Sequence, residues 1–252
     1  MSKVIAIANQ KGGVGKTTTA INLSAVLAEK GQRVLTVDID PQGNTTSGLG
    51  VGKDELERTI YELLIGECSL QECLRREVYE HLDLIPSNVN LAAVEIELLD
   101  ADGKEFILRD RLKDIRNDYD YILIDCPPSL SLLTVNAMTT ADSVLVPIQC
   151  EYYALEGLSQ LVHTVGLVRE RLNQSLELEG VVFTMYDART NLSMQVVDNV
   201  RGHIAERVFK TIIPRNIRLA EAPSYGQPIT LYEPKSAGAE AYRLLADELM
   251  GS

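Results

Sequence analysis

The residues best suited to chemistry stand together near the N-terminus, in the sequence NQKGGVGKTTT at positions 9–19. Closely spaced glycines let backbone N–H groups curl around an anion, and a helix starting behind them adds the positive end of its dipole. Lys16 would neutralise the outer phosphates of a nucleotide, and the Thr17 hydroxyl would ligate Mg²⁺. The pattern therefore predicts a phosphate-binding loop whose contacts are Gly12, Gly13, Val14, Gly15, Lys16, Thr17 and Thr18.

This loop departs from the strict G-x-x-x-x-G-K-[ST] pattern. Gln10 stands where the first glycine is expected, and a second lysine, Lys11, follows it. A tight turn between a strand and a helix would explain the glycines alone. It would not explain a Lys-Thr pair at the correct offset behind a strand, so we keep the phosphate-binding interpretation.

Two later segments end in acids and could bring carboxylates to the same place. The run RVLTVD leads into a loop that contains Asp38 and Asp40, and YILID ends at Asp125. The first loop also has ordinary turn residues, and an apolar strand often simply ends in a polar residue. Beside a phosphate-binding loop, however, Asp125 could hold a water of the Mg²⁺ shell opposite Thr17.

Apolar runs of strand length alternate with helical patterns along most of the chain, which predicts a mainly parallel, doubly wound sheet with helices on both faces. We expect strands at 4–8, 33–38, 82–85, 121–125, 143–148, 180–185 and 208–213. Helices are expected at 17–30, 54–64, 69–74, 89–99, 104–116, 130–141, 154–173, 192–205 and 237–250. Residues 46–119 should be mostly helical. Loops at the carboxyl ends of such strands form the ligand crevice.

Composition favours one α/β domain over residues 1–252, because 45 % of the chain is apolar and no Pro/Ser-rich linker divides it. No early segment resembles a signal peptide and no apolar run reaches about 18 residues, so we expect a soluble, cytoplasmic protein. The four cysteines, Cys68, Cys73, Cys126 and Cys150, have no metal-ligand spacing. A net charge of −12 argues against a uniformly basic nucleic-acid binder.

Several motifs resemble those of the ParA/Soj chromosome-partitioning ATPases, which belong to the ParA/MinD group with a deviant Walker A motif. The motifs are KGGVGKTT, DIDPQG, ILIDCPPS, DARTN at 187–191 and IIPRNIRLAEAPSYGQP at 212–228. The last two favour the partition branch over MinD, and the resemblance covers essentially the whole chain. It implies a P-loop ATPase that uses ATP and Mg²⁺ and dimerises when ATP is bound. It also implies non-specific DNA binding, and release when a ParB-like partner stimulates hydrolysis, so the ATP form should associate with the nucleoid.

The resemblance also assigns individual roles. Lys11 would reach across a homodimer to the partner's phosphates, and Asp40 would orient the attacking water, so that Lys11, Lys16 and Asp40 serve catalysis. Pro214 and Asn216 would lie against the adenine. A strand-ending proline explains Pro214 equally well. Arg189 and Arg218 would contact DNA phosphates.

A local basic excess supports the DNA assignment. Between positions 201 and 218 the chain has five basic residues against the single acid Glu206: Arg201, Arg207, Lys210, Arg215 and Arg218. A solvated helix face would also explain such a run.

Other uses of the same scaffold stay open. A MinD-like membrane cycle would need a basic amphipathic tail, whereas EAYRLLADELMGS has more acids than bases. An iron–sulfur reductase would need cluster cysteines that this chain lacks. A metabolic kinase or ligase, such as a dethiobiotin-synthetase-like enzyme, is a more distant alternative.

Overall fold

The computed structural model describes residues 2–53, 56–151, 154–204 and 208–251, and within them eight strands form one sheet. The strands are β1 (Lys3–Ile7), β2 (Val34–Asp38), β3 (Arg75–Tyr79), β4 (Leu82–Ile85), β5 (Tyr121–Asp125), β6 (Ser143–Gln149), β7 (Glu177–Tyr186) and β8 (Val208–Pro214). Their order is β3-β4-β2-β5-β1-β6-β7-β8, and every neighbouring pair is parallel except β3 and β4. The doubly wound, mainly parallel sheet predicted from the sequence is confirmed.

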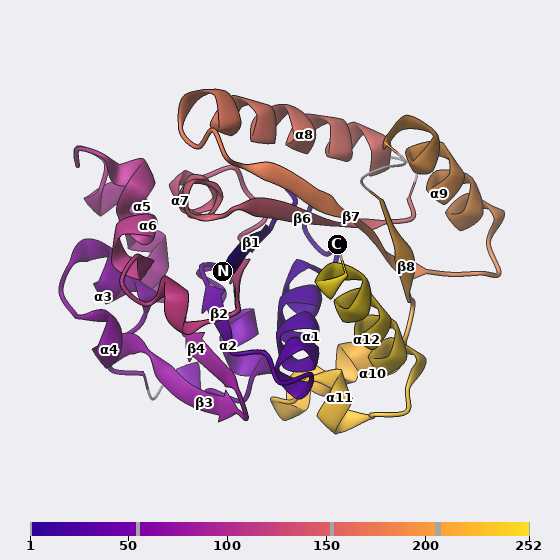
Figure 1. Ribbon diagram of the computed structural model, residues 1–252, viewed down its shortest axis with the longest axis horizontal. Coiled ribbons are helices and arrows are strands. Elements are labelled where there is room, and N and C mark those ends of the chain that lie inside the picture. The colour runs from indigo at the N-terminus through magenta and orange to yellow at the C-terminus, as the bar shows by residue number, and fades with distance from the viewer. Residues whose placement is uncertain (1, 54–55, 152–153, 205–207, 252) are drawn as a thin grey trace.

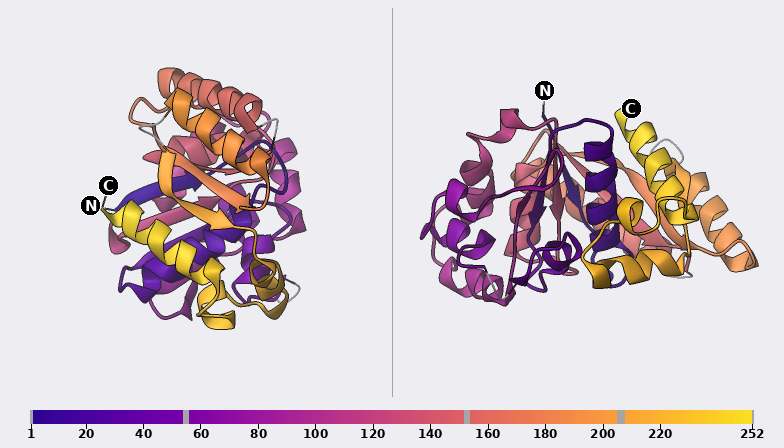
Figure 2. Two further views of the ribbon diagram at one scale, coloured as in Figure 1. Left: turned by 90° about the vertical axis from the view of Figure 1, so that its right-hand side faces the viewer. Right: turned by 90° about the horizontal axis from the view of Figure 1, so that it is seen from below.

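Helices cover both faces of this sheet (Figure 1). The α-helices are α1 (Lys16–Glu29), α2 (Asn44–Gly48), α3 (Ile60–Ile65), α4 (Leu70–Cys73), α5 (Val94–Glu97), α6 (Ile107–Leu112), α7 (Leu132–Thr140), α8 (Ala154–Arg171), α9 (Asn191–Ile204), α10 (Ile217–Glu221), α11 (Ile229–Tyr232) and α12 (Ala237–Met250). The turned view in Figure 2 shows the strands between α8 and α9 on one side and α12 on the other. None of these helices, as far as the chain is described, has the length and apolar character needed to cross a membrane.

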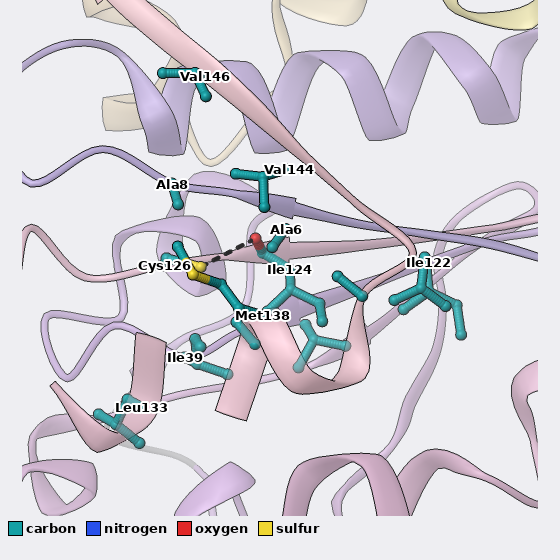
Figure 3. Packing of buried hydrophobic residues seen from close by; sticks show 14 of the residues in the cluster. Ala6, Ala8, Ile39, Ile122, Ile124, Cys126, Leu133, Met138, Val144 and Val146 are labelled. Atoms are coloured by element: carbon teal, nitrogen blue, oxygen red, sulfur yellow. Dashed lines mark hydrogen bonds between the residues drawn. The ribbon is translucent and has the colours of Figure 1, made fainter. Parts of the chain in front are cut away.

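Alternation along the central strands divides the interior into two cores. In β1, Val4 and Ala6 belong to the core under α7 and α8, while Ile5 and Ile7 belong to the core under α1 and α12. Successive side chains of a strand point to opposite faces, so a strand covered on both faces must be apolar throughout. Figure 3 shows the first core, with the Cys126 thiol 3.8 Å from the carbonyl oxygen of Ile124.

Helix α1 links the phosphate-binding loop to the second core. It is buried nearly all round, because it packs between the sheet and α12. It ends at Glu29, with Lys30 as its C-cap, directly before Gly31, where the sequence predicts the stop. The φ of Gly31, 80°, is left-handed. The N–H of Gly31 donates to Ala28 and that of Gln32 to Leu27, which is the hydrogen-bond pattern of a Schellman cap. This cap fixes the length of α1 and therefore where its first turn lies.

The region from 46 to 119 differs from the sequence-based expectation. It contains β3, an antiparallel edge strand that the prediction assigned to the helical flank. Its sequence, RREVY, contains three charged residues, and none of the five is fully buried, since an edge strand has only one neighbour. Val78 and Tyr79 are partly buried against the core. The expected helices at 89–99 and 104–116 are broken into short 3₁₀ and α-helical pieces, and the start of the one expected at 54–64 lies outside the described residues.

Candidate nucleotide-binding site

The glycine-rich loop lies where β1 ends and α1 begins, at the carboxyl edge of the parallel strands. Gly13 (φ 73°) and Gly15 (φ 90°) have left-handed backbone, which residues with a Cβ adopt only at a cost. Helix α1 starts at Lys16 directly behind Gly15, and no side chain caps its N-terminus. Its first N–H groups are therefore available to a ligand, and the backbone has the geometry of an anion cradle.

Side chains from two neighbouring strands hold this loop in place. Gln149, at the end of β6, donates from Nε2 to the carbonyl oxygen of Gly13 at 2.7 Å. Thr184 on β7 donates from Oγ1 to the carbonyl oxygen of Val14 at 2.8 Å. Both bonds use carbonyl oxygens of the loop as acceptors, so they do not engage its backbone N–H groups, which can donate to a ligand.

Lys16 is a buried cation aimed into the cradle. The residue is only 7 % exposed, and its Nζ donates to the carbonyl oxygen of Lys11 at 3.2 Å. Burial lowers the pKa of Lys16, while the nearby charges of Asp125 and Asp40 act in the opposite direction. A lysine placed in this way gains a strong charge-assisted partner when an anionic group enters the loop.

Asp125, at the end of β5, accepts two hydroxyl hydrogen bonds on one oxygen. Thr17 Oγ1 lies 2.8 Å and Thr45 Oγ1 2.7 Å from Asp125 Oδ2. The second oxygen, Oδ1, is buried and has no hydrogen-bond partner among the residues that the structure describes. A buried carboxylate oxygen without a donor is costly unless a cation or an ordered water satisfies it. Thr17 and Asp125, predicted to share a metal site, therefore do lie together.

A second buried acid, Asp38, ends the neighbouring strand β2 in register with Asp125. Burial, followed by the charge of Asp38, raises the pKa of Asp125 to about 7. Burial also raises the pKa of Asp38 to about 6, although Thr46 donates to its carboxylate from both N and Oγ1. Among the described residues, no group of three or more His, Cys, Asp or Glu side chains could hold a metal ion. A cation here would therefore need further oxygens from phosphate or water.

Asp40 lies two residues beyond β2 and is 8 % exposed. Its Oδ1 accepts from the N–H of Gln42 at 2.9 Å, and its carbonyl oxygen accepts from Ser87 Oγ at 2.8 Å. These two bonds fix both the backbone and the carboxylate. The negative charge of Asp40 acts on Lys16 and on Asp125, so the three groups share one electrostatic environment.

A cavity of about 460 Å³ opens beside the loop and extends to the segment after β8. It is lined largely by apolar surface and joins Gly15 and Thr18 to the predicted adenine residues Pro214 and Asn216. Asn216 caps α10 by accepting from the N–H of Arg218 at 2.8 Å, so its position is fixed by the backbone. An apolar cleft with a few fixed polar groups is the usual form of a site for a flat heterocycle.

Lys11 differs from Lys16 in its exposure and in its partner. Its side chain is 42 % exposed, and Nζ forms an ion pair with Glu151, which follows β6. The structure thus places Lys11 at the rim of the loop.

The two arginines predicted to contact DNA also lie at the surface. Arg189 follows β7, and Arg218 lies in α10, just after β8; the two strands end as neighbours. Asp187 pairs with Arg189 through Nε at 2.9 Å and an NH2 group at 2.7 Å, and these bonds hold the pKa of Asp187 well below its usual range. Glu221 pairs with Arg218 at 2.7 Å. Arg207 and Glu206, from the basic run noted in the sequence, lie outside the described residues.

Asp38, expected from the sequence to bring a carboxylate to this place, lies beside Asp125. Three other residues of the site were not predicted from the sequence. Thr45 donates to Asp125, and Gln149 and Thr184 support the loop. They are polar residues whose roles follow only from strand order in the folded chain.

A family model described as an AAA domain matches residues 2–178. Among curated proteins, the chain is 55 % identical over 249 residues to the sporulation initiation inhibitor protein Soj of Bacillus subtilis, covering 99 % of this chain and 98 % of Soj. It is 54 % identical over 250 residues to the chromosome partitioning protein ParA of Myxococcus xanthus, covering 99 % of this chain and 88 % of ParA.

Among solved structures, the chain resembles a cobyrinic acid a,c-diamide synthase of Mycobacterium smegmatis, determined with a bound ATP analogue and magnesium. The TM-score is 0.85 and the identity 40 %, over 99 % of this chain and 95 % of that one.

Proposed function

Because the chain belongs to the ParA/Soj family of chromosome-partitioning proteins, we propose that it is an ATPase that segregates a chromosome or plasmid. The ATP-bound form dimerises and binds DNA without sequence preference, and a ParB-like partner stimulates hydrolysis and so releases the DNA. One observation carries this proposal. The anion cradle, the Thr17–Asp125 pair and an apolar cavity meet at the same edge of the sheet.

ATP and Mg²⁺ fit the residues at this edge. The triphosphate lies against the N–H groups of residues 12–18 and the buried ammonium of Lys16, and the adenine occupies the cavity beside Pro214 and Asn216. Thr17 and Asp125 would hold Mg²⁺, because a hydroxyl and a carboxylate are suitable oxygen ligands and Asp125 Oδ1 lacks a donor among the described residues. The ion would neutralise charge on the phosphates. The ATP analogue and magnesium in the related Mycobacterium structure support this assignment.

Hydrolysis needs a water aligned with the terminal phosphate, and Asp40 orients it. Its carboxylate is fixed by the N–H of Gln42 and is close enough to act on the charge of Lys16. Phosphoryl transfer depends on positioning the water and on stabilising the charge of the transferring phosphoryl group. A stimulating partner completes both, so turnover by the chain alone is slow.

DNA binding depends on dimerisation because the chain is acidic as a whole and has only a small basic patch. The chain carries −12 and repels DNA, so one small patch with Arg189 and Arg218 binds weakly. A dimer presents two such patches on one body, and the second contact is then nearly intramolecular. Lys11, reaching the second copy's phosphates, makes dimerisation depend on ATP.

Sedimentation velocity tests this function directly. Wild-type protein with Mg²⁺ and a non-hydrolysable ATP analogue should dimerise and co-sediment with duplex DNA of any sequence. Lys11→Ala should retain analogue binding and lose both the dimer and the DNA. Lys30→Ala, at the far end of α1, is the matched control and should behave as wild type. An unchanged dimer in Lys11→Ala would remove the cross-subunit role.

Two further assays on the wild-type protein distinguish the proposed function from its alternatives. Acceleration of ATP use by a small acceptor, with no effect of DNA, would favour a metabolic ligase. ATP-dependent binding to anionic vesicles would favour a MinD-like cycle.

A further inference from the structure

Lys11 and Glu151 form an ion pair that joins the phosphate-binding loop to the segment between β6 and α8. Both side chains are substantially exposed, at 42 % and 53 %. The pair lies within a single chain. In the function proposed above, the Lys11 ammonium must reach the phosphates bound by a second copy. Here the same ammonium is paired with Glu151 of its own chain.

The backbone on both sides of this ion pair is tied down. Asn9 donates from Nδ2 to the carbonyl oxygen of Pro147 at 2.8 Å, and its Oδ1 accepts from the N–H of Lys11 at 3.0 Å. Gln149 donates to Gly13 from the same end of β6. Because these bonds hold the two segments together, releasing Lys11 from Glu151 requires only side-chain rotation.

We propose that Glu151 holds Lys11 within its own chain and thereby sets how readily the protein dimerises. The inference rests on the proposed function, since it assumes that Lys11 crosses to a second copy. Glu151 is a positioning residue in this account, because it acts only through Lys11.

The charge of the pair gives Glu151 this role. The lysine ammonium is a compact charge on a four-carbon stem and can rotate away from the carboxylate. When Lys11 leaves to reach a second copy, the attraction between the two charges is lost, and this loss opposes dimerisation. Neutralising Glu151 removes the attraction and should therefore favour dimerisation.

The size of the effect follows from the exposure of the pair. A solvent-exposed ion pair changes an equilibrium by about 1.4-fold to 5-fold. A symmetric dimer breaks two such pairs, so Glu151→Gln should lower the dimer dissociation constant by about 2-fold to 30-fold. Glutamine keeps the length and hydrogen-bonding capacity of the side chain and removes only the charge.

The experiment measures the dimer dissociation constant by sedimentation velocity with Mg²⁺ and a non-hydrolysable ATP analogue. It compares wild type, Glu151→Gln, Lys11→Ala, and the double variant. Glu156→Gln is the matched control, because Glu156 is an exposed glutamate on the following helix α8. Glu151→Gln should dimerise more tightly, Glu156→Gln should match wild type, and the double variant should match Lys11→Ala.

Three results would contradict the inference. If Glu151→Gln dimerised as wild type or more weakly, Glu151 would instead be orienting Lys11 or making a contact of its own. An equal gain from Glu151→Gln in the Lys11→Ala background would show that Glu151 acts without Lys11. A wild type that stays monomeric with the analogue would overturn the proposed function and this inference with it, whereas the first two results leave that function standing.

Discussion

The buried groups at the bottom of the phosphate cradle differ from the exposed cations that the sequence predicts to bind phosphates. Lys16 and Asp125 are buried, and Asp125 has an oxygen that no donor among the described residues satisfies. Lys11, Arg189 and Arg218 are exposed, and each is paired with a carboxylate of its own chain. The buried groups are thus prepared for a ligand that enters the fold, while in the proposed function the exposed cations exchange one anionic partner for another.

This difference implies different energies. A buried charge without its partner costs several kcal/mol, so a ligand that supplies the partner is bound strongly. An exposed ion pair contributes about 0–1 kcal/mol, so replacing its carboxylate by a phosphate changes little on its own. In the proposed function, binding by the exposed cations therefore depends on several weak contacts acting together, which a dimer would supply. The following predictions test this contrast, from the largest expected effect to the smallest.

The largest effect should come from Lys16→Ala. Removing one partner of a buried charge pair costs about 2–5 kcal/mol of binding free energy, so binding of ATP should fall by about 30-fold to several thousand-fold. Isothermal titration calorimetry measures this, with Lys30→Ala as the control at the other end of α1. Wild-type affinity in Lys16→Ala would remove the phosphate-binding role of the loop.

Asp40→Ala should affect turnover and leave binding intact. The variant loses the carboxylate that we propose orients water and keeps the cradle, so ATP hydrolysis should fall by about 100-fold or more while ATP-bound dimers accumulate. A steady-state phosphate-release assay with DNA and the ParB-like partner measures the rate. Its counterpart is Asp120→Ala, an exposed acid at the opposite edge of the sheet. Stimulated hydrolysis at the wild-type rate would eliminate the role of Asp40.

Asp125→Asn should change the pH dependence of stability. Its pKa in the folded chain, about 7, lies above the unfolded value, so the carboxyl's contribution to stability is present below about pH 4 and is lost as pH rises through 7. Asparagine cannot ionise. The variant should therefore have a free energy of unfolding about 1–3 kcal/mol above wild type at pH 8, and this gain should vanish near pH 4.

Urea unfolding without nucleotide or magnesium, at pH 4, 6 and 8, measures this effect. Asp120→Asn is the opposite case, because the hydrogen bond from Arg33 lowers the pKa of Asp120. The contribution of the Asp120 carboxylate to stability is present above its unfolded pKa and is lost as pH falls through its lower folded pKa. A gain for Asp125→Asn that did not depend on pH would mean that packing, and not ionisation, is responsible.

The smallest effect should come from the two exposed arginines, Arg189 and Arg218. Arg189→Glu or Arg218→Glu should weaken ATP-dependent DNA binding for all sequences, and each lost phosphate contact should reduce the log–log salt slope by about 0.9. Arg33→Glu is the matched control, because Arg33 forms the same bidentate pair with Asp120 at the opposite edge of the sheet. A salt titration of DNA affinity with the ATP analogue measures all four proteins. Equal slopes would place the DNA surface elsewhere.

Most of the sheet could be predicted from the sequence because its central strands are covered on both faces. Such strands are apolar without interruption, as in β1 and β5, and they stand out from their surroundings. The edge strand β3 could not be predicted, since three of the five residues in RREVY are charged and the other two, Val78 and Tyr79, are only partly buried. The helical pieces between 86 and 119 reach the core through residues such as Leu91 and Leu108, so their apolar spacing indicates helix and does not show where the helix breaks.

The cradle was also predictable, because its requirements are local. Left-handed backbone at Gly13 and Gly15, followed at once by a lysine and a hydroxyl at a helix start, depends only on neighbouring residues. Spacing along the chain is therefore enough to predict that Lys16 and Thr17 lie together at the start of α1.

What the tertiary structure decided is which distant residues meet this cradle. Asp38 adjoins Asp125 because β2 and β5 are neighbours, although 86 residues separate the two acids. Glu151 reaches Lys11 because β6 lies beside β1, across 140 positions of sequence. Strand order comes from packing the whole sheet, which no local pattern encodes. The sequence by itself therefore determined the phosphate-binding chemistry, and the fold determined the carboxylates that tune it.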